Sequence, residues 1–248
     1  MTFRTKILNV FRRFFKWGPA EKWIIRRANG REAGSFIAKF LPNHYQYSIP
    51  SVRKATRNEI NYELDISDLM DWFVYFGLKE KSKSVLFANM KEGNVIIDVG
   101  ANLGEISLNA AKITGTSGKV FAFEPGKKNF EKLSRNLALN KFQQLTTFRS
   151  ALGDHTGKGK EVVREVNNSG MNEVNYSDKG DFRITTLDLF LTEHTVEKID
   201  LIKIDTEGFE MNILKGAKTT LEKYHPVLFV EVDDDNLRRN GSSAKKLI

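Results

Sequence analysis

The sequence has no cysteine, and it has only four histidines and five prolines among 248 residues. Without cysteine the chain cannot form a disulfide, a thiolate metal site or a thiol nucleophile, and thiolate-bound iron–sulfur chemistry is excluded too. None of the histidines stands within a motif, so none is assigned as a general base. With 40% hydrophobic and 28% charged residues, the composition is that of a globular protein. The length allows one large α/β domain with an N-terminal accessory region.

Positive charge is concentrated at the N-terminus. Residues 1–30 hold eight basic groups and one acid, a net charge of +7, whereas the whole chain has +8. Since only about +1 remains for the other residues, the main domain is not expected to carry a basic groove for nucleic acid. We therefore expect no nucleic-acid partner.

Residues 1–17 have the pattern of an amphipathic helix. Apolar side chains recur at three- and four-residue spacing with basic residues between them. Charge interrupts this segment too often for a membrane span or a signal-peptide core, so we expect a cytoplasmic protein. The helix either lies on an anionic membrane surface or packs against its own domain or a second subunit of an oligomer, and both alternatives stay open. The apolar positions are Phe3, Ile7, Val10, Phe11, Phe14 and Trp17, and the basic ones are Arg12, Arg13 and Lys16.

Residues 18–60 are expected to form an irregular connector, punctuated by Gly18-Pro19, Leu41-Pro42-Asn43 and Ile49-Pro50. We divide the chain into an N-terminal region, 1–60, and a main domain, 61–248. Within the latter, Ser67 or Asp68 is placed to cap a helix that carries Trp72 and Phe76.

From residue 95 onward, short apolar runs alternate with amphipathic stretches. This alternation predicts βαβ units and a mainly parallel, doubly wound α/β sheet with helices on both faces. The polar stretch 154–185 interrupts the pattern, and we expect an insertion over the carboxyl edge of the sheet, where ligands bind in such folds. Strands are expected at 95–99, 120–123, 146–150, 201–204 and 227–232, and helices near 105–114, 127–140, 210–223 and from 235.

The first motif is Asp98-Val-Gly100-Ala101-Asn102-Leu-Gly104, in which a strand ends in a carboxylate and turns through small residues into a helix. Gly100 would allow a ligand to approach the backbone, and Gly104 would allow close packing of helix on strand. A dinucleotide site would show Gly-x-Gly-x-x-Gly, and Asp98 would repel its pyrophosphate. A cofactor with an ammonium and a sulfonium suits Asp98 better. A purely structural turn is the alternative for this motif taken alone.

The second motif is Phe123-Glu124-Pro125, where the next strand ends 26 residues after Asp98. A carboxylate at this point can accept hydrogen bonds from both hydroxyls of a ribose. Pro125 would offer a rigid apolar surface to the adenine. NAD sites share the acid, so it indicates an adenosine ligand more firmly than it chooses the cofactor.

The third motif is Ile202-Lys203-Ile-Asp205-Thr-Glu207-Gly208-Phe-Glu210. Glu210 is explained by the preference for acids in the first turn of a helix. Asp205 and Glu207, with Glu231 at the end of the fifth strand, should meet at one sheet edge, where they can act as a general base or hold a divalent cation. The sequence gives no further support for a metal, and none is assigned.

Together these segments resemble the FkbM-type methyltransferases, a branch of the class I methyltransferases with a Rossmann-like fold. The resemblance covers about residues 57–241, and its most specific part is the third motif. Further matching parts are Asn61-Tyr-Glu-Leu-Asp65, Trp72 to Gly77, Asn136, Asn140, Ala151-Leu-Gly153, Leu214-Lys-Gly-Ala217 and Glu231.

The resemblance implies methyl transfer from S-adenosyl-L-methionine to a hydroxyl of a sugar, glycan, lipid-linked or polyketide-type small-molecule acceptor. By position, Asp98, Gly100, Ala101, Asn102 and Gly104 would line the methionine part of the cofactor, Glu124 would hold the ribose, and Pro125, Ser150 and Ala151 would lie near the adenine. Asp205, Glu207 and Glu231 are the candidate catalytic residues.

One feature departs from the class I pattern of seven strands, because only five core strands are expected and the last two are missing. The outer edge of the fifth strand then needs a cover. Two rival functions are an RNA methyltransferase and an inactive membrane-associated binding module. Against the first stand the nearly neutral domain and the lack of an Asn/Asp-Pro-Pro-Tyr/Phe motif after the fourth strand.

Overall fold

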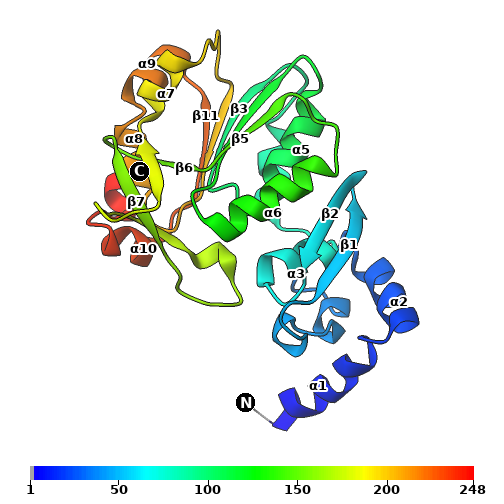
Figure 1. Cartoon of the computed structure of the whole chain (residues 1–248). Helices are drawn as coiled ribbons and strands as arrows, with labels where there is room; N and C mark the ends of the chain where they lie inside the picture. The colour runs from blue at the N-terminus through cyan, green and yellow to red at the C-terminus, as the bar shows by residue number, and fades with distance from the viewer. Residues whose placement is uncertain (1–2) are drawn as a thin grey trace. The chain divides into compact units, whose positions relative to one another are not determined.

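The computed structural model describes residues 3–248, with side chains from Leu8 onward, and the chain divides into two compact units (Figure 1). The first unit comprises Met1–Leu86 and Val166–Ser169, and the second comprises Phe87–Glu165 and Gly170–Ile248. The boundary expected after residue 60 falls at the start of the strand β2 (Ile60–Asp65), which pairs with β1 (Val52–Arg57). The units therefore divide later than the sequence suggested.

In the first unit, helices and 3-10 turns surround the β1–β2 hairpin. They are α1 (Phe3–Phe14), α2 (Gly18–Ala28), η1 (Ile37–Phe40), η2 (His44–Gln46) and α3 (Leu69–Phe76), and α4 (Lys81–Ala88) runs across the unit boundary. The helix α1 lies within the predicted span 1–17, of which residues 1–2 and the side chains of Phe3 and Ile7 lie outside the described part.

Two helices of this unit show how local chemistry sets their ends. The prediction that Asp68 caps a helix is confirmed, because its Oδ1 accepts a hydrogen bond from Met70 N at 3.0 Å at the start of α3. The prediction of an irregular connector after residue 18 is wrong for α2. Pro19 lies in the first turn of this helix, where its missing N–H costs no hydrogen bond.

The segment Val166–Ser169 belongs to the first unit although it lies far along the chain. Ser169 Oγ donates to Asp68 Oδ1 at 3.0 Å, and Leu69 N donates to Asn167 O at 2.9 Å. These bonds fix a short piece of the polar stretch 154–185 against the start of α3.

The second unit contains a five-stranded sheet in the order β11-β10-β3-β4-β5, and every neighbouring pair is parallel. The predicted parallel α/β sheet is thus confirmed. Its strands are β3 (Val95–Val99), β4 (Lys119–Phe123), β5 (Leu145–Phe148), β10 (Leu201–Ile204) and β11 (Val227–Val230). The chain runs from β3 outward in one direction and from β10 outward in the other. Their junction is the topological switch point at which such folds bind ligands.

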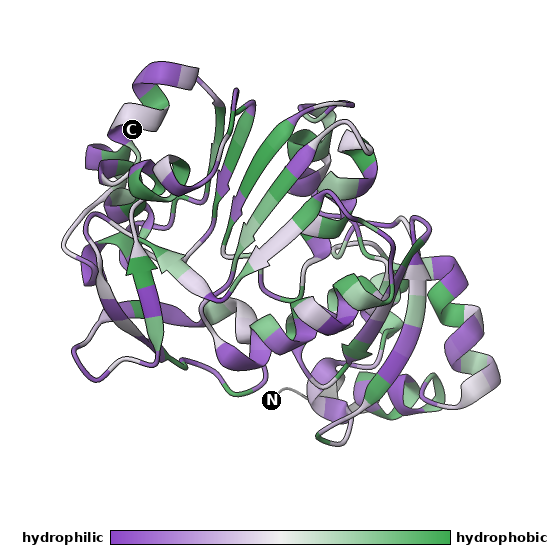
Figure 2. Ribbon diagram, turned by 45° about the horizontal axis from the view of Figure 1, so that its top comes forward, coloured by the Kyte–Doolittle hydropathy of each residue, from purple (hydrophilic) through white to green (hydrophobic). Residues whose placement is uncertain are grey.

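Helices cover both faces of this sheet. On one face lie α5 (Glu105–Thr114) and α6 (Lys127–Ala138), and on the other lie α7 (Leu187–Glu193), α8 (Glu210–Lys215) and α9 (Lys218–Tyr224) (Figure 1). The strands between them are largely hydrophobic, whereas the helices are mixed (Figure 2). The single helix expected over 210–223 is divided at Gly216 into α8 and α9. Only glycine fits there, because a Cβ would lie 1.9 Å from the Gly153 carbonyl oxygen.

The polar insertion is a second sheet, which the sequence reading did not anticipate. It has the order β6-β9-β7-β8 and consists of β6 (Ser150–Leu152), β7 (Gly157–Val162), β8 (Glu173–Tyr176) and β9 (Phe182–Thr185). The strand expected over 146–150 ends at Phe148, and the chain then enters β6. Val174, Phe182 and Ile184 share one hydrophobic core with the large sheet, so the insertion is packed against it.

At the other end of the large sheet, β11 pairs with β10 alone, and Val227 and Leu228 are half exposed. Within residues 3–248, only the short helices α10 (Asp234–Arg239) and α11 (Ala244–Leu247) follow it, as the prediction of five core strands requires. None of the described helices is long and apolar enough to cross a membrane.

We predict that Gly100→Ala lowers the free energy of unfolding by at least about 2 kcal/mol. Gly100 has a φ of +80°, and an added Cβ would lie 1.9 Å from the carbonyl oxygen of Asp205. Urea unfolding followed by circular dichroism measures the change. Gly34→Ala is the control, because no atom lies within 4 Å of its Cβ position. Equal stability of the two variants would contradict the prediction.

Candidate functional site

The ends of β3, β4 and β10 bring the predicted acids to one edge of the sheet. Lys203 of β10 pairs in register with Asp98 of β3, which pairs in register with Ala122 of β4. Glu124 follows β4, and Asp205 follows β10 directly. The structure therefore places the three motifs beside one another at the switch point.

Lys203 is the residue that the sequence reading missed, and it lies at the centre of this edge. Its side chain is 2% exposed, and its Nζ lies 3.3 Å from Asp98 Oδ1 and 3.6 Å from Asp205 Oδ2. The ammonium also donates to the carbonyl oxygens of Val99 at 3.1 Å and Gly100 at 2.8 Å. Burial lowers the pKa of Lys203, but Asp98 and Asp205 raise it more, so the pKa stays above its ordinary value.

Asp98 is fully buried, and its charge is compensated within the protein. Its Oδ2 accepts a hydrogen bond from Ser107 Oγ of α5 at 2.5 Å, and its Oδ1 faces Lys203. From the sequence alone, Asp98 is expected to face a cationic cofactor, because a motif shows the acid without its partner. In the structure, the buried cation that Asp98 faces is Lys203.

The turn after β3 shows why its small residues are needed. The close neighbour of Gly100 is the backbone of Asp205, rather than an open space, and a Cβ on Gly104 would lie 2.5 Å from Leu133 of α6. Ala101 is buried, and its N–H donates to the Phe123 carbonyl oxygen at 3.0 Å. Asn102 has a φ of +49°, a left-handed conformation that asparagine tolerates better than most residues. The turn is thus held closely against β4 and β10.

Glu124 is the acid that the second motif assigned to a ribose. Its Oε2 accepts a hydrogen bond from Asn102 N at 2.8 Å and its Oε1 accepts one from Gly126 N at 2.9 Å. Burial raises the pKa of Glu124 to about 7, against the lowering effect of the two backbone N–H groups, and the carboxylate of Glu161 adds to the increase. Each carboxylate oxygen retains a lone pair for a further donor.

The remaining residues predicted near an adenine have different surroundings. Pro125 follows Glu124 and is partly exposed, whereas the side chain of Ala151 belongs to the hydrophobic core. Ser150 begins β6 and is partly exposed. The Ala151 side chain is therefore not available to an adenine. The Pro125 ring and the backbone of β6 remain as the groups that could lie against one.

Asp205, Glu207 and Glu231 form the acid cluster of this site. One oxygen from each lies within 4.8 Å of the others. Burial and the negative charges of Asp205 and Glu210 raise the pKa of Glu207 to about 7. Burial and its acidic neighbours also raise the pKa of Glu231 well above its ordinary range, and Glu231 hydrogen-bonds Asp205. A divalent cation would find ligands at this spacing, but carboxylates that share protons account for the arrangement, and no metal is assigned.

Glu210 is buried and has the local role that the sequence indicated. Its Oε1 accepts hydrogen bonds from Thr206 N and Gly208 N, both at 3.0 Å, at the start of α8. These bonds hold the turn in which Glu207 has a φ of +55°. The backbone that carries Glu207 is fixed by this contact.

A second set of contacts, which the sequence reading did not anticipate, fixes the Glu207 side chain. Asn236 Nδ2 of α10 donates to Glu207 Oε2 at 2.5 Å. Arg239 donates to Asn236 Oδ1, which orients the amide with its nitrogen toward Glu207. The guanidinium of Arg239 also lies 3.0 Å from Oε1 of the buried Glu173 in β8, and Arg164 binds the other Glu173 oxygen. The inserted sheet and α10 thus both support the acid cluster.

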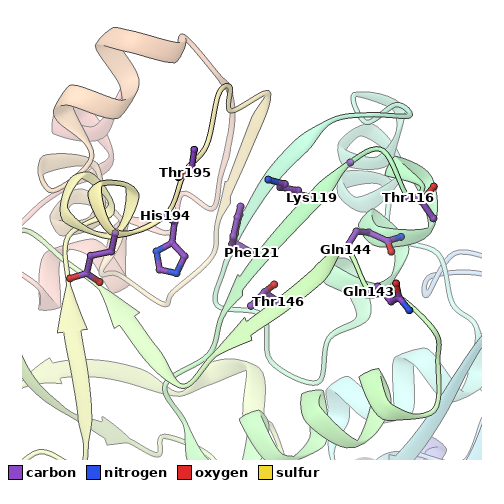
Figure 3. A pocket seen from close by; sticks show the side chains of 10 residues that line it. Thr116, Lys119, Phe121, Gln143, Gln144, Thr146, His194 and Thr195 are labelled. Atoms are coloured by element: carbon purple, nitrogen blue, oxygen red, sulfur yellow. The ribbon is translucent and has the colours of Figure 1, made fainter.

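A pocket of about 560 Å³ opens at the opposite, amino edge of the sheet (Figure 3). It lies between the starts of β4 and β5 and the end of α7, where His194 stacks on Phe190 with ring centroids 4.0 Å apart. None of the predicted site residues lines it. We therefore assign it no part in the chemistry of the carboxyl edge. Its lining includes Thr116, Lys119, Phe121, Gln143, Gln144, Thr146, Glu193, His194 and Thr195.

We predict that Lys203→Met lowers the free energy of unfolding by about 3–5 kcal/mol, because it leaves Asp98 charged and buried without its partner. The double variant Asp98→Asn/Lys203→Met should recover part of that loss, since the uncompensated charge is then gone. Urea unfolding of the wild type, both single variants and the double variant gives the coupling energy. Additive losses would show that the two groups do not interact.

We further predict that Asn236→Ala raises the pKa of Glu207 above about 7, because the amide hydrogen bond favours the charged carboxylate. A carbon-detected NMR titration of the Glu207 carboxyl group measures the shift. The groups that face Glu207 are Asp205, Glu210, Glu231 and Asp233, and they are the same in both proteins. Arg238→Gln, on the exposed side of the same helix, should leave the titration unchanged. An unchanged pKa in Asn236→Ala would contradict the assignment.

Comparison with known proteins finds relatives of the part of the chain that carries this edge. The Methyltransferase FkbM domain matches residues 98–248, which include all three motifs. The chain is 29% identical to the hexuronic acid methyltransferase AglP of Haloferax volcanii over 166 residues, covering 65% of this chain and 66% of that protein. It is 33% identical to the methyltransferase sdnD of Sordaria araneosa over 163 residues, covering 52% and 62%. The chain thus spans slightly less than two thirds of these relatives.

Solved structures resemble the chain only distantly, and the likeness concerns the fold alone. A precorrin-6y C5,15-methyltransferase from Geobacter metallireducens is 15% identical with a TM-score of 0.42, covering 66% of this chain and 68% of that one. An S-adenosylmethionine-dependent O-methyltransferase from Thermotoga maritima is 17% identical with a TM-score of 0.40, covering 76% and 59%. Because the domain match spans more than half of its residues, this chain belongs to the Methyltransferase FkbM domain family.

Proposed function

We propose that this chain is an S-adenosyl-L-methionine-dependent methyltransferase that acts on a hydroxyl oxygen, with a sugar or glycan as the favoured acceptor. The observation that carries the proposal is the acid cluster at the switch point, beside the turn between β3 and α5. In this cluster Glu207 has a pKa of about 7. A carboxylate with such a pKa can accept the proton of a hydroxyl near neutral pH.

The residues at the edge fit the proposed cofactor. Glu124 lies at the end of β4 with lone pairs left on both oxygens, as a ribose diol requires. The cofactor would supply an electrophilic methyl group on a sulfonium, which favours a negatively charged surrounding. Of the two carboxylates that pair with Lys203, Asp205 has a side chain that is 44% exposed and could face the cofactor, whereas Asp98 is buried. We therefore assign Asp98 to holding the turn through Lys203 and Ser107.

On the acceptor side, we assign Asp205, Glu207 and Glu231 to binding the hydroxyl and taking its proton. Because burial and its acidic neighbours raise the pKa of Glu231 well above its ordinary range, Glu231 keeps its proton near neutral pH. Glu207, with a pKa of about 7, is the member that can take up a proton there. Orienting the hydroxyl oxygen toward the methyl group is the other contribution that the protein makes. Asn236 supports this geometry by fixing Glu207.

A sugar acceptor is supported by one relative, which is named a hexuronic acid methyltransferase. Lipid-linked and polyketide-type acceptors remain within the same proposal, because they also present a hydroxyl. The nearly neutral main domain gives no support to RNA as the acceptor.

We predict that Glu124→Ala weakens binding of S-adenosyl-L-methionine by about tenfold or more, because hydrogen bonds to a charged group are lost. Isothermal titration calorimetry measures the affinity. Glu222→Gln, an exposed acid on α9, is the control. If the protein binds NAD tightly and does not bind S-adenosyl-L-methionine, the proposed cofactor is wrong.

For the acceptor side, Asp205→Asn should remove methyl transfer and leave most of the cofactor affinity. The assay uses methyl-labelled cofactor with hexuronic acids and a glycan extract, and mass spectrometry identifies the labelled product. An equal loss of affinity and turnover would place Asp205 against the cofactor instead.

A further inference from the structure

The first two helices expose a group of large apolar side chains. Val10, Phe11, Phe14 and Trp17 are between 60% and 67% exposed, and Trp23 of α2 is 49% exposed. We call these five residues the aromatic surface. The Phe14 ring lies 6.5 Å from the Trp17 ring and 5.5 Å from the Phe15 ring. Phe15 in turn stacks on Trp23 of α2 at 6.0 Å, so the rings form one connected group.

The polar face of α1 is the one that packs on its own unit. Arg12 Nε of α1 donates to the Lys39 carbonyl oxygen at 2.9 Å, and Lys16, in the turn after the helix, donates to the Gln46 carbonyl oxygen. The Lys16 ammonium also lies 5.0 Å from the Tyr47 ring. A helix that served only to cover its own unit would bury its apolar face instead. Among the side chains that the structure describes, Val10, Phe11 and Phe14 of α1 thus remain exposed rather than packed on its own unit.

The charge around the aromatic surface has a single sign. Arg13, Lys22, Arg26 and Arg27 are exposed, and the Arg27 guanidinium lies 5.6 Å from the Trp23 ring. Glu21 is the only acid among residues 1–30, and it is buried, within 3.3 Å of the Tyr47 hydroxyl. No exposed carboxylate from this segment therefore offsets its basic groups.

We propose that the aromatic surface and its flanking cations dock on an anionic lipid membrane surface. Tryptophan and phenylalanine enter the interfacial layer of a bilayer, and arginine and lysine bind its phosphate groups. A second copy of this chain fits less well, because a two-fold contact would place two segments of charge +7 face to face. The inference is independent of the proposed methyl transfer, since none of these residues belongs to the acid cluster.

The test is co-sedimentation of the full chain with lipid vesicles. We expect binding to vesicles of phosphatidylcholine with about 30% phosphatidylglycerol. Affinity for vesicles of phosphatidylcholine alone should be lower by about tenfold or more. Binding should fall when NaCl is raised to about 0.5 M, which shortens the range of the attraction. Tryptophan fluorescence should shift to the blue on binding, because Trp17 and Trp23 are exposed whereas Trp72, the third tryptophan, is buried.

Matched variants distinguish binding through the aromatic surface from nonspecific hydrophobic adsorption. The triple variant Phe11→Ser/Phe14→Ser/Trp17→Ser should lose binding by about tenfold or more. Val163→Ser/Val166→Ser removes other exposed apolar side chains, which are 58% and 75% exposed, and should bind as the wild type does. Circular dichroism confirms that each variant is folded.

Two results would overturn the proposal. One is vesicle binding by the triple variant that equals the wild type. The other is sedimentation equilibrium that shows a dimer lost in the triple variant, together with no vesicle binding, which would make a second copy the occupant.

Discussion

The ammonium of Lys203 is the interaction on which the carboxyl edge of this sheet depends. A buried cation beside two carboxylates is tolerated because the opposite charges compensate one another and because two carbonyl oxygens accept hydrogen bonds from the ammonium. Through these contacts Lys203 joins the end of β3 to the end of β10, across the junction where the order of strands reverses. The turn at Gly100 can lie against Asp205 because that junction is closed.

This arrangement also divides the acids into two groups. The charge of Asp98 is compensated by the buried Lys203 ammonium. Glu207 and Glu231 face other carboxylates, which raise their pKa above the ordinary value. The difference comes from one strand position, since Lys203 points toward the α5 face and meets Asp98 there. Acids that look alike in the sequence therefore have opposite electrostatic surroundings in the fold.

The large sheet could be predicted from the sequence because buried parallel strands are short, continuous apolar runs, as at β3 and β10, which were placed with their observed bounds. The inserted sheet could not, because its strands mix polar with apolar residues and do not form continuous apolar runs, as in Gly157–Val162. In addition, β6 follows β5 after one residue. The helix α2 was missed because Gly18-Pro19 is also a turn signal.

In the site, the acids were found because they end strands. Their partners were not, because contacts such as Lys203 with Asp98 or Asn236 with Glu207 join residues that are far apart in the chain. An isolated lysine inside an apolar strand was the one available signal for Lys203. For Asn236 and Arg239 the sequence offered none, since both sit in a helix whose composition is that of an ordinary solvated surface.

The chain passes between the two compact units three times, because Val166–Ser169 returns to the first unit from within the inserted sheet. A single cut in the chain therefore cannot separate the two units. A fragment that begins after Leu86 would keep those four residues but lose Asp68 and Leu69, to which they are hydrogen-bonded. The complementary fragment would retain a buried Asp68 carboxylate without the Ser169 hydroxyl that binds it. Neither fragment would keep these hydrogen bonds, so a cut after Leu86 would disturb both units at once.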